Sequence, residues 1–399
     1  KIKFIILRDS TGMIQITGIK GKTPEKIFKD MEKIPRESSV YVHGKIVESS
    51  QAPGGKEINP EELIVINKAE ELPIDLPLNS IDDSTTELPK RLDYRFLDLH
   101  RKKVQAIFKI QGEIANAFRE FFYKQEFTEV FLPSIISGSS EGGTDLFSVD
   151  YFEKKAYLAQ SPQLYKQMLA CSPFEKVFTI TPVWRAEKHN TIRHLNESRQ
   201  MDIEVAYANQ EKIMKYLEEA MQFIVKRIIE KCKEELKILK SEVKVPKVKY
   251  LRYDETVKLL KIKYGEDLSP EDEKKLGEKF PDTIVFVYSW PVSIKPFYIM
   301  PKEEKADAKL SEGFDAIYKG LEITSGGQRI HIPELLEKRI KAKGLNPKNF
   351  KSYMDSFRFG APPHAGWSIG LERLTQLIAG EKNISEAVLF PRDRDRLTP

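Results

Sequence analysis

The sequence predicts an α+β fold with a largely antiparallel sheet, and three features of its hydrophobic pattern support this. Short segments that alternate apolar and polar residues fill positions 1–70. Two later stretches, 101–124 and 210–239, repeat apolar residues at helical spacing, and short apolar runs lie between and beyond them. Because these strands and helices do not alternate regularly, the pattern favours α+β over a parallel βαβ arrangement.

The composition is typical of a globular chain with a large core. Its 399 residues include 65 Lys+Arg and 60 Asp+Glu, which gives a formal charge of +5, and 40% of them are hydrophobic. This balance excludes a disordered acidic tail and a strongly basic DNA-coating protein, and the length predicts two or three domains. No apolar run approaches the roughly 18–20 residues that span a membrane, and no signal peptide opens the chain, so we expect a cytoplasmic protein.

The cysteines and histidines do not predict a zinc site. Cys171 and Cys232 are the only cysteines, and the six histidines are scattered, so neither a CxxC nor an HExxH spacing occurs. We therefore expect both cysteines to be small buried apolar residues.

Residues 1–70 are expected to form a small Greek-key barrel of the oligonucleotide-binding (OB) type. Alternating apolar residues predict strands around positions 2–6, 14–16, 40–42 and 63–66, and a helical stretch follows Pro24. Such a barrel needs five strands. Because the chain begins at Lys1 inside a strand-like run, we expect the first strand to be missing from this sequence.

Residues 71–100 are predicted to be a hinge, and residues 101–399 the large domain. Pro73, Pro77 and Pro89 interrupt the hinge, which lacks any sustained periodicity. The large domain should begin with the helix 101–124, followed by a strand over 127–132 that Pro133 stops. Further strands are expected at 177–180, 284–288 and 297–300.

Two segments combine polar residues with the flexibility or spacing of a binding site. Residues 137–144 are rich in glycine and serine and carry Glu141, which fits either a solvated loop or a lid that closes over a substrate. In 160–166, Gln163 and Lys166 lie three residues apart at a helix start. They would share one helix face, where they could hold a carboxylate or simply face solvent.

Two further segments present arginines and a carboxylate. Residues 184–204 read as a strand, a polar loop and a returning strand, so Arg185 should either pair with Glu187 on its own strand face or bind a phosphate. In 322–329, Glu322 and Arg329 flank a glycine pair and suggest a metal-binding carboxylate and an anion clamp. Residues 370–373 would bring Arg373 close to a backbone turn at a helix start.

In this order and spacing, the segments resemble the three signature motifs of class II aminoacyl-tRNA synthetases. Residues 127–133 resemble motif 1, 184–204 motif 2 and 366–373 motif 3, and the preceding barrel narrows the resemblance to the aspartyl, asparaginyl and lysyl group. The run ending in Lys166 is similar to the aspartyl type, because asparaginyl enzymes usually carry an acidic residue there. The closing residues 390–394 resemble the archaeal and eukaryotic branch. One departure is Ser368, which stands where motif 3 commonly repeats glycine.

The resemblance implies a role for individual residues. Aspartate would contact Glu141, Gln163, Lys166, Arg185, Ser325 and Arg329. ATP would contact Arg185, Glu187, Arg193, His194, Leu195, Glu322, Gly370 and Arg373. Glu322 and Ser325 would hold Mg²⁺, and catalysis would rest chiefly on Arg185, Glu322 and Arg373. Phe4 would stack on an anticodon base, unless it lies in the barrel core.

The resemblance also implies partners: L-aspartate, the aspartate tRNA, and a second copy of the chain bound through motif 1. Enzymes strict for the aspartate tRNA tend to carry lysine near the position of Pro53. Proline offers no donor that would exclude a wrong base. We therefore expect an enzyme that also charges the asparagine tRNA and hands the product to an amidotransferase. The alternatives are an asparaginyl-tRNA synthetase and a catalytically inactive synthetase-like RNA-binding protein.

Overall fold

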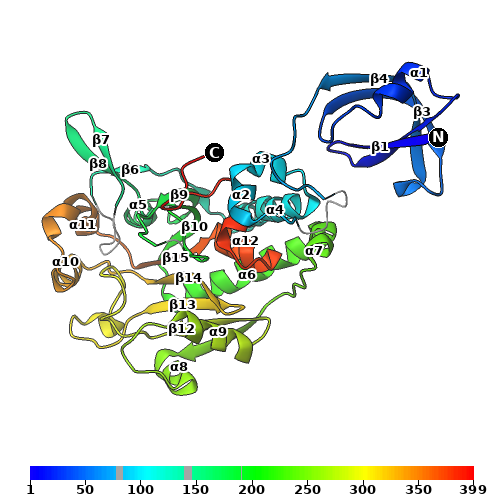
Figure 1. The fold of residues 1–399 in the computed structure, drawn as a ribbon. Coiled ribbons are helices and arrows are strands. Elements are labelled where there is room, and N and C mark those ends of the chain that lie inside the picture. Colours follow the sequence, from blue (N-terminus) through cyan, green and yellow to red (C-terminus); the bar gives the residue numbers. More distant parts are fainter. Residues whose placement is uncertain (78–83, 139–145, 190) are drawn as a thin grey trace. The chain divides into compact units, whose positions relative to one another are not determined.

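The structure is a computed structural model that describes residues 1–77, 84–138, 146–189 and 191–399 (Figure 1). By backbone contacts the chain divides into two compact units, Lys1–Asp75 and Leu76–Pro399. In the described part of the chain, no helix combines the length and apolar character needed to cross a membrane.

The first unit is a small β-structure around a compact apolar core. Its elements are β1 (Ile2–Arg8), β2 (Met13–Ile19), α1 (Glu25–Asp30), β3 (Ser39–Glu48), a 3₁₀ turn at Pro53–Gly55 and β4 (Lys56–Asn67). The strands lie in the order β1-β2-β4-β3. Ile16, Ile27 and Met31 form the core. All four predicted strands are present.

The second unit is built on an eight-stranded sheet. Its strands are β5 (Thr128–Glu129), β9 (Lys176–Trp184), β10 (Glu197–Ala206), β11 (Lys247–Arg252), β12 (Thr283–Tyr288), β13 (Gly313–Tyr318), β14 (Leu321–Gln328) and β15 (His364–Gly370). Their order is β11-β12-β13-β14-β15-β10-β9-β5. Only the outermost pairs, β11 with β12 and β5 with β9, are parallel, which confirms the predicted α+β class. A second sheet joins β6 (Ile135–Ile136), β8 (Lys154–Leu158) and β7 (Ser148–Tyr151).

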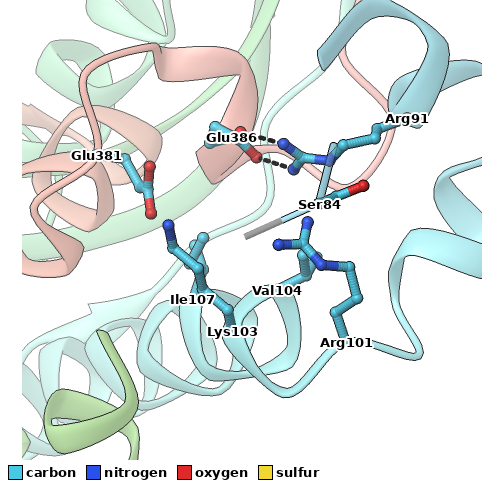
Figure 2. Close-up of a pocket in the computed structure, with 8 residues that line it drawn as sticks. All are labelled: Ser84, Arg91, Arg101, Lys103, Val104, Ile107, Glu381 and Glu386. Carbon is cyan, nitrogen blue, oxygen red and sulfur yellow. Dashed lines mark hydrogen bonds and ion pairs between the residues drawn. The ribbon is translucent and has the colours of Figure 1, made fainter. Parts of the chain in front are cut away.

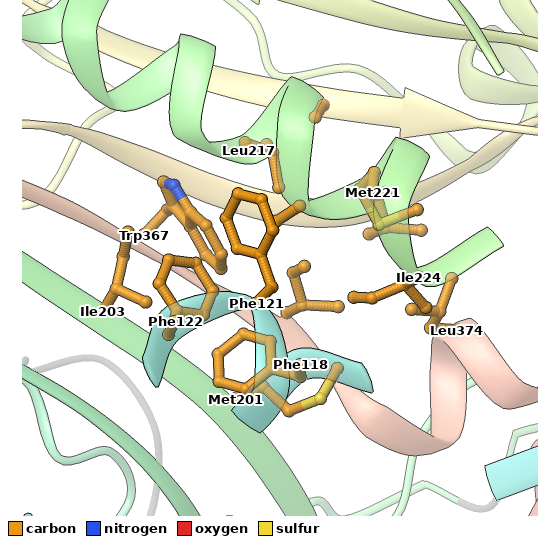
Figure 3. Close-up of a cluster of buried hydrophobic side chains, with 14 of the residues drawn as sticks. Phe118, Phe121, Phe122, Met201, Ile203, Leu217, Met221, Ile224, Trp367 and Leu374 are labelled. Atoms are coloured by element: carbon orange, nitrogen blue, oxygen red, sulfur yellow. The ribbon is translucent and has the colours of Figure 1, made fainter. Parts of the chain in front are cut away.

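Three helices cover one face of the large sheet and bury the main core. They are α4 (Lys102–Lys124), α6 (Gln210–Lys231) and α12 (Leu371–Ala379), which lie beside one another (Figure 1). Figure 3 shows Phe118 and Phe122 of α4 against Trp367 of β15. Because side chains alternate along a strand, Met201 and Ile203 enter this core, and Asp202 between them faces the other side.

Other helices pack on the opposite face. There α5 (Gln163–Ala170) packs on β9 and β10, and α9 (Pro270–Lys279) packs on β12, β13 and β14. The remaining helices are α2 (Leu88–Asp93), α3 (Arg95–Asp98), α7 (Lys233–Leu239), α8 (Tyr253–Leu260), α10 (Pro333–Ala342) and α11 (Lys351–Arg358), with 3₁₀ turns at Lys302–Glu304, Pro347–Phe350 and Ile384–Ala387. β15 thus lies between the two strands, β10 and β14, on which α5 and α9 pack.

Several element boundaries differ from the predicted ones. The helix expected over 210–239 breaks at Cys232, and α7 then packs on α4 and brings Leu239 to the core. Residues 297–300 form no strand: Ile299 makes one isolated bridge to Arg329, between prolines 296 and 301 that cannot donate to a ladder. The strand expected over 127–132 is only Thr128–Glu129. Within the predicted hinge, residues 88–93 and 95–98 are helical.

Candidate active site

Two buried cations from different elements lie together on the face of the sheet opposite the main core. Lys166, in the first turn of α5, donates from Nζ to Asp202 Oδ1 at 2.6 Å and to the Trp367 carbonyl at 3.2 Å, and lies 3.5 Å from Glu204 Oε2. Arg329 follows β14 and donates from Nε and Nη2 to the two oxygens of Glu204 at 2.8 and 3.2 Å. The four side chains therefore form an alternating network of two cations and two carboxylates.

The charges in this network set each other's protonation. Burial raises the pKa of Asp202 above its ordinary value, and Lys166 opposes that only in part. Burial would raise the pKa of Glu204 as well, but Arg329 and Lys166 outweigh it and hold the pKa below its ordinary value. Glu204 is thus the firmly ionised member. Removing one partner from such a pair costs about 3–5 kcal/mol, because a buried charge is left unpaired.

The same pocket keeps hydrogen-bond donors for a ligand. An ammonium has three N–H donors and a guanidinium five. Lys166 uses two, and Arg329 uses two, on the protein groups named above. Gln163, at the start of α5, is buried, and its Nε2 has no partner within the described residues. Since an unpaired buried donor costs about 1–3 kcal/mol, these groups suit a ligand with carboxylate oxygens.

A chain of neutral hydrogen bonds lies beside this network. Tyr353 donates to Gln167 Oε1 at 2.7 Å, so the Gln167 amide nitrogen, 3.2 Å from His364 Nε2, is the donor to that ring. His364 Nδ1 then carries the proton and donates to the Pro362 carbonyl at 2.9 Å. Burial lowers the pKa of His364 to about 4, so the ring is neutral at pH 7. This arrangement adds no further charge beside Arg329.

A second carboxylate cluster depends on an irregularity in the sheet. Glu322 and Ser325 are three residues apart on β14, so regular alternation would put them on opposite faces. The pairing of β13 with β14 slips between Ala316 and Ile317, so Ser325 lies opposite Asp315 while Glu322 lies opposite Ile317. This bulge places Glu322 and Ser325 on the same face.

The second cluster is short of positive charge. Asp315 pairs with Lys295, whereas burial, and then the charge of Asp315, raise the pKa of Glu322 to about 8. Two buried carboxylates close together repel each other when both are ionised, so binding a cation between them is favourable. Mg²⁺ takes one or two carboxylates and fills its other positions with water or phosphate oxygens. In the described ranges no group of three His, Cys, Asp or Glu could hold a metal. Asp315, Glu322 and the exposed Ser325 hydroxyl fit that sparser requirement.

Basic side chains of motif 2 lie close to Arg373. Arg185 follows β9 directly, and within the described residues its guanidinium makes no ion pair with Glu187. Partial burial lowers the pKa of His194, as do Arg373 and Arg185, while Glu187 opposes the shift. These side chains are therefore close enough to act on one another, and they form a surface suited to phosphates.

The start of α12 fixes the position of Arg373. Arg373 donates from Nη1 to the Glu322 carbonyl at 2.8 Å, which joins this arginine to the second cluster. Gly370 is the N-cap, where an added Cβ would lie 3.4 Å from Arg373 Cβ. Arg193 instead points to Glu273 of α9 at 3.4 Å. Leu195 is buried against Ile384 and Val388, so its side chain supports the loop rather than facing a ligand.

Three other predicted residues lie elsewhere. Glu141 falls outside the described residues. Phe4 belongs to the first unit and is 59% exposed, so it is not part of the barrel core. Pro53 begins the exposed 3₁₀ turn of the same unit.

Cavities formed by the described residues of the second unit include the following two. One of about 580 Å³ adjoins motif 2, and its lining includes Trp184, Glu187 and Arg392. The other, of about 230 Å³, is bounded by Ser84, Arg91, Arg101, Lys103, Val104, Ile107, Glu381 and Glu386, and Figure 2 shows Arg91 directed at Glu386. It contains none of the predicted site residues. Arg91 is also paired with Asp98, so the charged residues beside this cavity form a structural ion-pair network.

Sequence reasoning missed Asp202, Glu204 and Asp315. Asp202 and Glu204 alternate with buried Met201 and Ile203 on a central strand. Two carboxylates that alternate with core residues on a central strand are costly to bury unless they are paired, and that pattern was the signal available for them. Asp315 interrupts the apolar strand β13 in the same way.

Comparison with known proteins fits this geometry. Residues 87–394 match the family model of class II tRNA synthetases (D, K and N), and residues 1–66 match the OB-fold nucleic acid binding domain. The chain belongs to the class II tRNA synthetase family. It is 45% identical over 406 residues to an aspartate–tRNA(Asp/Asn) ligase of Methanocaldococcus jannaschii, covering 100% of this chain and 91% of the relative. An enzyme of the same name from Archaeoglobus fulgidus is 45% identical over 403 residues, covering 99% and 92%.

Solved structures of this synthetase family have the same fold over nearly the whole chain. The asparaginyl-tRNA synthetase of Pyrococcus horikoshii, complexed with asparaginyl-adenylate, matches with a TM-score of 0.92 at 35% identity, covering 99% of this chain and 92% of that one. An aspartyl-tRNA synthetase of Entamoeba histolytica matches with a TM-score of 0.87 at 34% identity, covering 100% and 86%.

Proposed function

We propose that this synthetase activates L-aspartate with ATP and transfers it to tRNA. The observation that carries the proposal is the buried pair Lys166 and Arg329, which keeps unused donors beside the unpaired amide of Gln163. An aspartate side chain would bring carboxylate oxygens to those donors. The names of the archaeal relatives, aspartate–tRNA(Asp/Asn) ligases, support the same substrate.

The charge of the pocket favours aspartate over asparagine. A neutral amide would present its NH₂ group to Lys166 or Arg329, where two donors would meet with no acceptor between them. Sites that lose a required hydrogen-bond partner in this way can reject the analogue by about 10⁴-fold or more. Pyrophosphate exchange into ATP should therefore depend on aspartate. Exchange with asparagine alone would favour an asparaginyl enzyme, and no exchange with either would favour an inactive RNA-binding scaffold.

The first step needs position and charge rather than a general base. An oxygen of the aspartate α-carboxylate would attack the α-phosphorus of ATP, and the bond from that phosphorus to the pyrophosphate oxygen would break. Arg185 and Arg373 would bind the phosphates and stabilise the charge that spreads over their oxygens. Asp315, Glu322 and Ser325 would hold Mg²⁺. When bound, the ion would supply positive charge to the phosphates.

In the second step a hydroxyl of the terminal adenosine of tRNA would attack the carbonyl carbon of the adenylate. The ester forms, AMP leaves, and a phosphate oxygen of the leaving AMP accepts the hydroxyl proton. Arg185, which follows β9 directly, would again bind this phosphate. Replacing Arg185 by glutamine should lower both exchange and charging, whereas a defect in charging alone would contradict this role.

Recognition of tRNA is assigned to the first unit. Phe4 is exposed on β1 together with Ile2 and Ile6, so its ring is available to stack on an unpaired base. Pro53 lies in an exposed turn and has no side-chain donor. We therefore propose relaxed recognition of the aspartate and asparagine tRNAs, with an amidotransferase acting on the misacylated product. Side-by-side aspartate charging of the two purified tRNAs tests this, and charging of the aspartate tRNA alone would contradict it.

A homodimer is proposed from the exposed apolar surface of motif 1. Phe131 is 86% exposed and Ile135 49%, on either side of the exposed Pro133. Large exposed apolar side chains clustered in this way are typical of an interface. Light scattering should give twice the chain mass for the wild type and one chain mass for Phe131→Glu. A monomeric wild type would exclude the dimer.

A further inference from the structure

Ser368 on β15 holds one of the carboxylates of the cation network. Its Oγ donates to Asp202 Oδ2 at 2.9 Å, and the two residues lie directly opposite each other on neighbouring strands. The other oxygen of Asp202 accepts from Lys166 Nζ at 2.6 Å. The two Asp202 oxygens are thus held by different donors, one from the sheet and one from α5.

The neighbouring residues of β15 on this face have no side chain that could bind Asp202. An added Cβ at Gly366 would lie 2.1 Å from Glu204 Oε2, so no side chain fits there. Gly370, on the other side, is the N-cap of α12. Ser368 is therefore the one residue between these two glycines on the site face that offers a side chain. Its cross-strand neighbour Ser325 lies opposite Asp315 on its other side and so belongs to the other cluster.

We propose that Ser368 is a positioning residue for the side-chain carboxylate of the amino-acid substrate, acting through Asp202 and Lys166. This inference rests on the proposed function, because it takes aspartate as the ligand of Lys166. Ser368 itself does not touch that ligand. It fixes the orientation of Asp202, and Asp202 in turn fixes where the Lys166 ammonium lies.

The physical argument concerns two flexible side chains. The last torsion of an aspartate side chain is broad, so a carboxylate held at one oxygen can rotate. A lysine ammonium sits on a four-carbon stem and takes its position from its partners. With the Ser368 hydroxyl present, Asp202 is held at both oxygens and Lys166 is directed by Asp202 and by the Trp367 carbonyl. Without the hydroxyl, the remaining contacts leave Asp202 free to turn, and Lys166 follows it.

Steady-state pyrophosphate exchange on the full chain tests this. We expect Ser368→Ala and Ser368→Gly to raise the KM for aspartate about 3- to 10-fold, while the KM for ATP and kcat stay within about twofold, since a hydrogen bond to a charged group is at stake. Ser368→Thr keeps the hydroxyl and should restore the aspartate KM.

A matched control is Ser241→Ala. The Ser241 hydroxyl is also half-buried and donates to the Ile378 carbonyl, away from the pocket. This variant should leave all constants unchanged. Three outcomes would each overturn the inference. The KM for aspartate and the KM for ATP could rise equally, or the aspartate KM could be unchanged in Ser368→Ala. The third is a defect that a folded Ser368→Thr does not reverse. A wild type without aspartate-dependent exchange would overturn the proposed function and this inference together, whereas an active wild type with unaffected variants overturns this inference alone.

Discussion

Two carboxylate pairs lie on the same face of the large sheet, and their charges are balanced differently. Asp202 and Glu204 have a cation each within hydrogen-bonding distance, whereas in the other pair Lys295 forms an ion pair with Asp315, and Glu322 has no ion pair in the described part of the chain. Burial acts on both pairs. The pKa of Glu204 is nevertheless below its ordinary value, and the pKa of Glu322 is raised to about 8. One pair is neutralised by the protein, and the other is not.

This difference corresponds to what each pair would receive. The balanced pair holds Lys166 and Arg329 in place with donors left over, which suits an incoming anion. Binding a cation would stabilise the unbalanced pair, Asp315 and Glu322, which suits Mg²⁺ carried with phosphates. The cross-strand row Asp202, Ser368, Ser325 and Asp315 joins the two pairs across three strand interfaces. Amino acid and metal would therefore meet on neighbouring strands.

The largest effect should come from breaking the balanced pair. Arg329→Gln leaves Glu204 without its bidentate partner and removes one cation from the pocket. We expect aspartate-dependent exchange to fall at least about 10³-fold, and stability to fall by about 3 kcal/mol, because a buried carboxylate loses its counter-charge. Exchange kinetics and denaturant unfolding measure both. Arg339→Gln, which removes another buried arginine with a bond to the Val292 carbonyl, should keep its activity. Retained exchange in Arg329→Gln would contradict the assignment of the pocket.

The neutral histidine beside the balanced pair should make stability depend on pH. The folded pKa of His364 is about 4 and its ordinary value is 6.5, so on acidification the unfolded chain takes up this proton first. Stability is therefore present above pH 6.5 and lost as the pH falls toward 4, by up to about 3 kcal/mol. His364→Gln should show a smaller loss over that range. All three tryptophans lie in the second unit, so their fluorescence follows its unfolding. The control variant is His43→Gln, because the His43 side chain is exposed. Equal slopes in the wild type and His364→Gln would exclude this cause.

Neutralising the unbalanced pair should affect activity without harming the fold. Glu322→Gln removes a carboxylate that like charge and burial already disfavour, so thermal stability without metal should be unchanged or higher. Exchange at fixed Mg²⁺ should fall about 10- to 100-fold and recover in part at higher Mg²⁺, since ligand loss weakens metal sites on this scale. A Mg²⁺ titration of the exchange rate measures this. A destabilised variant with an unchanged Mg²⁺ requirement would show that Glu322 is structural.

Much of the fold followed from hydrophobic periodicity alone. The helix 102–124, the hairpin of β9 and β10 and the strands of the first unit lie where their apolar spacing predicts. Periodicity reports burial within one element and nothing about an element's neighbours. This is why the break at Cys232 was missed, since it depends on α7 turning to pack on α4.

The site residues also differ in whether local sequence is enough to find them. Lys166 and Arg329 were named from local spacing, Lys166 with Gln163 at a helix start and Arg329 with Glu322 around a glycine pair. Asp202 was not, because its partner on β15 lies far along the chain and only strand pairing brings the two together. Glu322 and Ser325 were named, but their common face depends on a bulge that their spacing argues against. Strand register and bulges depend on contacts between distant segments, which a single sequence does not display.

The smallest effect distinguishes the two serines at the centre of the row. Ser325→Ala removes a hydroxyl that acts on Asp315 and would contact Mg²⁺, so we expect a two- to fivefold higher Mg²⁺ requirement and an unchanged aspartate KM. Ser368→Ala should do the reverse, because its hydroxyl serves Asp202. Measuring both constants for both variants gives a crossed pattern if the two pairs act separately. Parallel changes would mean that the neighbouring hydroxyls work as one unit, and the division of this face into an anion side and a cation side would then be wrong.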